Sequence, residues 1–122
     1  MPVPKGPYSQ AVVVSGRRLL FVSGQVPEDE DGNLVGPGDL EAQTRQVLTN
    51  LRRIVEGAGG NLSDIVKIGV FLVGAGPTSY EVLGRLRREF FGVRFPASTM
   101  VGVQRLASPK WLIEIEAWAA LE

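Results

Sequence analysis

Two carboxylates, Glu114 and Glu116, are the groups in this sequence best placed for acid–base chemistry. They lie two residues apart in the segment 111–119, which is apolar at alternate positions. Because side chains alternate along a β-strand, both carboxylates share one face, together with Leu112 and Trp118. A carboxylate on a partly apolar surface is either a member of a site or an ordinary charge at its rim. The spacing by itself favours the rim, since charged residues on strands usually reach water.

Composition removes several other kinds of chemistry. The 122 residues include no cysteine and no histidine, which excludes thiolate nucleophiles, Cys/His zinc sites and Ser-His-Asp arrangements. The acidic run 28–31 lacks the spacing of a calcium loop, so a solvated turn is expected and no metal site is predicted. Thirteen basic residues balance thirteen acidic ones, which disfavours nucleic acid as a partner.

Length and hydropathy indicate a single domain over residues 1–122. The N-terminal residues lack the apolar core of a signal peptide, and no apolar run approaches the length of a membrane span. We therefore expect a cytoplasmic protein that does not bind membranes.

The hydrophobic pattern predicts an α+β fold with the order β-β-α-β-α-β-β and both helices on one face of the sheet. Asp39 is expected to cap the first helix, and Thr78, with Glu81 three residues later, to open the second. Gly69 leaves room for close approach of another group. The predicted elements are a hairpin of strands 11–15 and 19–24, a helix over 40–58, a strand over 64–73, a helix over 78–91, and neighbouring strands over 99–105 and 111–119.

Several of these strands are apolar on both faces, although two helices can cover only one face of a sheet. Val12 to Val14 and Leu19 to Val22 are continuously apolar. The second face should therefore be buried by further copies of the chain, most simply in a closed symmetric oligomer.

Five segments, taken together, resemble the RidA/YjgF family of reactive-intermediate deaminases. They are Gly6–Gln10, Phe21–Pro27, Gln43–Leu51, Phe95–Ala97 and Ile113–Ala117. The resemblance implies a homotrimer of chorismate-mutase-like protomers whose sheets form a central barrel, with clefts between subunits. It also implies cofactor-free hydrolysis of 2-imino or 2-enamino acids, and hence a small carboxylic acid as ligand.

The same resemblance assigns roles to individual positions. In typical members an arginine directly after Phe-Pro-Ala holds the substrate carboxylate, but here that position is Ser98. Arg94 or Arg105 is a candidate replacement, and restoring the arginine by Ser98→Arg is expected to raise turnover. The candidate site therefore consists of Glu114 as the catalytic residue and, for substrate binding, Tyr8, Ser23, Gly24, Ser98, Thr99 and Arg105.

Other functions remain open at the level of the sequence. The loss of the arginine is compatible with a small-molecule-binding trimer without catalysis. A tautomerase that uses the amine of Pro2, and a ribonuclease, are less well supported, because only Met1-Pro2 suggests the former and the neutral charge opposes the latter. Apart from the resemblance, Tyr8 is equally well a packed aromatic residue, and the hydroxyls of Ser23, Ser98 and Thr99 are by default satisfied locally.

Overall fold

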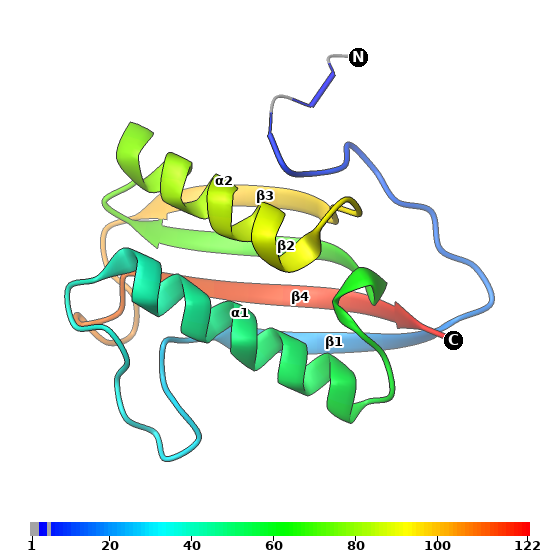
Figure 1. Ribbon diagram of the computed structural model, residues 1–122, viewed down its shortest axis with the longest axis horizontal. Helices are drawn as coiled ribbons and strands as arrows, with labels where there is room; N and C mark the ends of the chain where they lie inside the picture. The colour runs from blue at the N-terminus through cyan, green and yellow to red at the C-terminus, as the bar shows by residue number, and fades with distance from the viewer. Residues whose placement is uncertain (1–2, 5) are drawn as a thin grey trace.

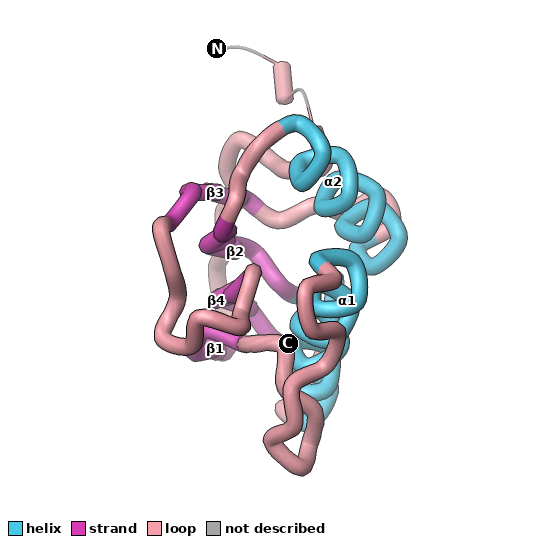
Figure 2. The backbone as a smooth tube through the Cα atoms, turned by 90° about the vertical axis from the view of Figure 1, so that its left-hand side faces the viewer, coloured by secondary structure: helices cyan, strands magenta, loops and turns pink. Residues whose placement is uncertain are grey.

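The computed structural model describes residues 3–4 and 6–122, which form a mixed four-stranded sheet with both helices on one side (Figures 1 and 2). The strand order is β1-β4-β2-β3. The α+β class and the position of the helices agree with the sequence prediction. The elements are β1 (Arg18–Gln25), α1 (Leu40–Gly57), a short 3₁₀ helix η1 (Leu62–Asp64), β2 (Ile65–Val73), α2 (Pro77–Phe91), β3 (Ala97–Val103) and β4 (Ile113–Leu121).

The last strand, β4, lies inside the sheet and pairs antiparallel with both β1 and β2. Its alternate residues point toward the helices and are buried, among them Ile113 and Ile115 with no exposed surface. Glu114, Glu116 and Trp118 lie between them in sequence and point to the opposite side, which we call the open face. The predicted division of this strand into an apolar face and a mixed face is confirmed.

The predicted pairing of the last two strands with each other is wrong. β2 lies between β3 and β4, and β3 runs parallel to β2 at the edge of the sheet. The connection β2–α2–β3 is a crossover, which makes the strands that it joins parallel. This leaves the other side of β2 for β4, whose fully apolar face needs a central position.

The predicted N-terminal hairpin is also not formed. Residues 11–15 contain no strand, and Val13 is 95% exposed, so the order in the described part of the chain is β-α-β-α-β-β with one strand fewer. The described part of one chain covers the neighbouring valines only in part, since Val12 is 42% and Val14 36% exposed. The backbone turns at Gly16 with φ 62°, a conformation that glycine adopts easily.

Both helices begin at capping interactions, one of which the sequence located correctly. The carboxylate of Asp39 accepts a hydrogen bond from the Ala42 amide at 3.1 Å, as predicted. The second helix begins at Pro77 instead of at a Thr78 cap, because proline suits the first turn of a helix, where its missing N–H is not needed. The hydroxyl of Ser79 accepts a hydrogen bond from the amide of Gly76 at 2.9 Å.

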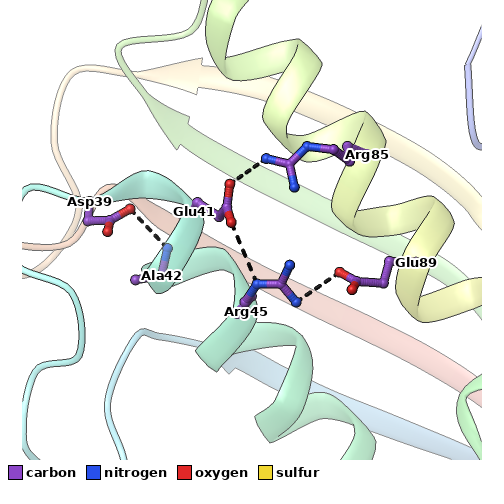
Figure 3. Close-up of polar contacts among 6 residues, drawn as sticks. All are labelled: Asp39, Glu41, Ala42, Arg45, Arg85 and Glu89. Atoms are coloured by element: carbon purple, nitrogen blue, oxygen red, sulfur yellow. Dashed lines mark hydrogen bonds and ion pairs between the residues drawn. The ribbon is translucent and has the colours of Figure 1, made fainter.

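Ion pairs join the two helices above the sheet (Figure 3). Arg85 on α2 bonds to Glu41 on α1, and Arg45 on α1 approaches Glu89 on α2 to 2.8 Å. The charged residues of α1 therefore partly serve as a helix–helix contact. Within the described residues, neither helix is long and apolar enough to cross a membrane.

Candidate functional site

Glu114 projects from β4 onto the open face, against the backbone of Gly24 on β1. A Cβ atom built on Gly24 would lie 2.0 Å from Oε2 of Glu114, so the carboxylate occupies the space that a side chain at position 24 would take. The close approach occurs where the β1–β4 register shifts between Val22 and Gln25. Ser23, the next residue on β1, is exposed beside it. The structure thus brings together three of the predicted site residues: Ser23, Gly24 and Glu114.

A second carboxylate is held in the same way further along the open face. A Cβ on Gly69 of β2 would lie 2.6 Å from Oε2 of Glu116, which confirms the predicted close approach at this glycine. In the next strand, the hydroxyl of Thr99 accepts a hydrogen bond from Nζ of Lys67 at 3.0 Å. Thr99 therefore belongs to the open face, where it is exposed.

Ser98, although adjacent to Thr99, points to the helix side. Its hydroxyl accepts a hydrogen bond from Nη1 of Arg87 on α2, at 3.2 Å. Arg87 is only 7% exposed, and burial lowers its pKa, with a smaller contribution from the neighbouring Arg88. Neither Arg94 nor Arg105, the replacements considered from the sequence, makes this contact.

Tyr8 lies at the same end of β3 as Ser98. The next residue, Ser9, pairs in parallel with Ala97, and its amide donates to the Pro96 carbonyl at 2.9 Å. Its hydroxyl also donates to the Phe95 carbonyl. These bonds hold the half-buried Tyr8 near the start of the edge strand.

Arg105 lies in the exposed loop after β3, and its guanidinium makes hydrogen bonds within that loop. Its Nε donates to the Leu106 carbonyl and its Nη2 to the Ala107 carbonyl, each at 3.2 Å. Arg94 is exposed and lines a hollow below the N-terminal segment, together with Ser9 and Asp64.

The predicted residues therefore form two groups within one chain. The register joins Ser98 to Ile68 and Glu114 to Phe71, so these two residues are two strands and three residues apart. At about 4.8 Å per strand and about 3.3 Å per residue, their Cα atoms are separated by roughly 14 Å. They also point to opposite faces of the sheet. A three- or four-carbon acid is too short to contact both groups of one chain.

Sequence reasoning missed Arg87. The signal was present, since Arg87 follows Leu83 by four residues and Leu86 by one, and so falls on the apolar side of the predicted helix. A charged residue on such a stripe must either find a partner or reach a site.

Sequence reasoning also missed the structural role of Gln43, which is fully buried on α1. Its Nε2 donates to the carbonyls of Gly36 and Lys110, at 3.0 and 3.1 Å, and its Oε1 accepts from the Leu112 amide at 2.8 Å. Gln43 therefore positions the loop from which β4 starts.

The acidic run 28–31 lies in a turn that is held by hydrogen bonds within the loop. The carboxylate of Asp29 accepts from the amides of Asp31 and Asn33, both at 2.9 Å, and Asn50 on α1 donates to the Glu28 carbonyl at 3.0 Å. Among the described residues, no cluster of three acidic side chains is placed to hold a metal ion. Pro2, considered for a tautomerase, lies outside the described residues.

Comparison with known proteins gives matches over almost the whole chain. The family model described as endoribonuclease L-PSP matches residues 1–121. A RutC family protein of Pyrococcus horikoshii is 40% identical, with 99% of this chain and 92% of that protein covered. A protein of Dermatophagoides farinae named 2-iminobutanoate/2-iminopropanoate deaminase is 34% identical, with 99% and 91% covered.

Solved structures match the fold equally well. The Rid family protein YyfB of Yersinia pestis superposes with a TM-score of 0.91 at 39% identity, covering 94% of this chain and 87% of that one. RidA from an Antarctic Psychrobacter species gives 0.76 at 33% identity, covering 98% and 93%.

Proposed function

Since this chain belongs to the endoribonuclease L-PSP family, which includes the RidA/YjgF and RutC proteins, we propose that it is a cofactor-free hydrolase of small 2-imino and 2-enamino acids. Its sites lie in clefts between the subunits of a homotrimer. The observation that carries this proposal is the Glu114 carboxylate, held on the open face by the absence of a side chain at Gly24.

The reaction needs only a base and a positioned water molecule. Glu114 accepts a proton as water adds to the C2 carbon of the imine, which forms a C–O bond and a tetrahedral carbinolamine. Glu114 returns this proton to the nitrogen and then transfers the proton of the new hydroxyl to the amino group; the C=O bond forms as the C–N bond breaks, and a 2-oxo acid and ammonia leave. Imine and water are thus consumed one for one, and a general base of this kind contributes about 10²- to 10⁴-fold. An enamine enters the same sequence after it tautomerises to the imine.

The separation of the two residue groups supports a site between subunits. Ser23, Gly24 and Glu114 lie on the β1–β4 side of the protomer, and Ser98 lies on β3, roughly 14 Å from Glu114. A neighbouring copy whose β3 end docks on the β1–β4 side would bring complementary groups together. The exposed apolar side chains of the open face, such as Leu19 and Phe21 (69% exposed), supply the surface for such an assembly.

The decisive experiment is a direct assay of imine decay. 2-Iminopropanoate is generated in situ by oxidation of alanine, and pyruvate and ammonia are measured with and without the protein. The proposal requires release faster than the rate in buffer and proportional to protein concentration. A rate equal to that in buffer across several 2-imino acids would refute it.

The alternative is a binding trimer without catalysis, which Ser98 favours because it replaces the arginine of typical members. In that case 2-oxo acids bind, but imine decay is not accelerated. The family description also names an endoribonuclease activity. The equal numbers of acidic and basic residues do not support a nucleic-acid surface on this chain.

A further inference from the structure

The buried arginine on α2, Arg87, has an incomplete set of partners. Its Nη1 donates to Ser98, but its Nε has no hydrogen-bond partner among the described residues. None of the ion pairs found in the described part of the chain involves Arg87. Burial lowers the pKa of Arg87, and the positive charge of the neighbouring Arg88 lowers it further.

A cation in this position is unfavourable by itself. Burial removes water from the guanidinium, and buried charges in proteins are normally paired. Two other arginines of these helices show the usual arrangement, since Arg45 and Arg85 each meet a glutamate while remaining partly exposed. Arg87 is therefore placed where an anion from outside the chain would balance its charge and complete its hydrogen bonds.

The free edge of the guanidinium suits a carboxylate. Nη1 is occupied by Ser98, which leaves Nε and Nη2, the two nitrogens that form the side-on fork of arginine. Two parallel N–H groups match the two oxygens of a carboxylate, whereas a lysine would offer only a point charge. Ser98 is half-buried on the edge strand, next to the segment that holds Tyr8. Arg87 itself is 7% exposed and its Nε is buried, so a ligand must enter beside Ser98 to reach the fork.

We propose that Arg87 is the residue that binds the carboxylate of the ligand, with the Ser98 hydroxyl fixing the orientation of its guanidinium. This inference rests on the proposed function, which supplies a 2-imino or 2-oxo acid as the ligand. It differs from what the resemblance implies, in which position 98 itself provides the guanidinium. The positive group comes from α2, and serine at position 98 leaves space for it.

Binding measured apart from turnover tests this assignment. Pyruvate and its uncharged amide, pyruvamide, are titrated by calorimetry into the assembled wild-type protein and the variants Arg87→Met, Arg87→Lys and Ser98→Ala. Arg85→Met is the matched control, because it removes an exposed guanidinium from the opposite side of the same helix.

Arg87→Met is expected to weaken pyruvate binding by about 10- to 100-fold, the usual effect of losing a bidentate charge-assisted pair, and to leave pyruvamide binding unchanged. Arg87→Lys should retain part of the affinity, Ser98→Ala should weaken it by a few-fold, and Arg85→Met should match the wild type. If Arg87→Met fails to fold, Arg87→Lys and Ser98→Ala still decide the question, since both are expected to lose affinity for pyruvate but not for pyruvamide.

Equal affinities of all variants for pyruvate would overturn the assignment, as would wild-type protein that binds pyruvate no better than pyruvamide. A structure of the assembly in which a carboxylate of a neighbouring subunit pairs with Arg87 would also overturn it. The proposed function fails separately. If the wild type binds pyruvate through Arg87 but does not accelerate imine decay, this inference stands and the proposed deaminase activity is refuted. If variants at position 87 hydrolyse imines as fast as the wild type, the deaminase activity stands and this inference is refuted.

Discussion

Gly24 lies directly beneath the Glu114 carboxylate, so close that a Cβ atom at position 24 would stand 2.0 Å from Oε2. The two residues are on adjacent strands, β1 and β4, at a shift in register. The glycine thus sets where the carboxylate lies on the open face.

Gly24→Ala should fold but lose activity. The atoms that the new methyl group meets belong to the flexible Glu114 side chain, so the side chain can move aside with a small loss of stability. A displacement of about 1 Å at a reacting group can cost about 100-fold in rate. We expect kcat for imine hydrolysis to fall by about that factor, with only a small decrease in the melting temperature. Gly57→Ala, where a Cβ would meet open space, is the control.

Glu114→Gln should lower kcat by about 10²- to 10⁴-fold, because the amide keeps the shape of the side chain but cannot accept the proton of water. Pyruvate affinity should change much less. Glu116→Gln, on the same face of the same strand, is the comparison and should have a far smaller effect. Equal rates for wild type and Glu114→Gln would make Glu114 an ordinary surface charge.

The apolar part of the open face should be an interface between copies of the chain. Phe21→Glu places a charge on this face, where Phe21 and Leu19 border a hollow that also includes Trp118. Loss of one buried phenylalanine per contact removes about 1.5–3 kcal/mol of burial free energy. Light scattering should show a trimer for the wild type and a smaller species for the variant. Tyr80→Glu, at an exposed aromatic residue of α2, should leave the wild-type mass unchanged.

Moving the carboxylate-binding guanidinium from position 87 to position 98 should require substitutions at both positions together. The resemblance alone favours a gain from Ser98→Arg, but the contact with Arg87 favours a loss. Two guanidinium groups about 4 Å apart repel by about 1–4 kcal/mol, depending on exposure. The double variant Arg87→Met/Ser98→Arg removes this repulsion and should bind pyruvate more tightly than either single variant. Calorimetry on all three proteins checks this ordering.

Gln43→Leu should be the most destabilising of the substitutions considered. It leaves two carbonyls and one amide, those of Gly36, Lys110 and Leu112, without their side-chain partner. Each such group that stays buried costs about 1–3 kcal/mol. Because Lys110 is exposed and its carbonyl can reach water, two groups count, and we expect a loss of about 2–6 kcal/mol in urea unfolding. Gln46→Leu, which removes a bond to Asn50 on a less buried part of α1, should cost under about 1 kcal/mol.

The sequence by itself determined the features that depend on near neighbours in the chain. The helix α1 and its Asp39 cap follow from residues within a turn or two of each other. The two faces of β4 follow from strict alternation, and the close approach at Gly69 follows from a missing side chain. Family membership belongs to the same category, since it rests on short motifs in a fixed order.

Only the tertiary structure decided which distant segments meet. The insertion of β2 between β3 and β4 depends on the crossover through α2, which no local pattern encodes. The run 11–15 has strand-forming residues but gains no partner in one chain, so propensity alone did not make it a strand.

The contacts that matter most for function are of the same long-range kind. Gly24 meets Glu114 across ninety residues of sequence, and Arg87 meets Ser98 through the packing of a helix on an edge strand. The sequence predicted that Glu114, Gly24 and Ser98 belong to a site. It did not predict the guanidinium beside Ser98, because an arginine on a helix stripe acquires its role only from the strand that it packs against.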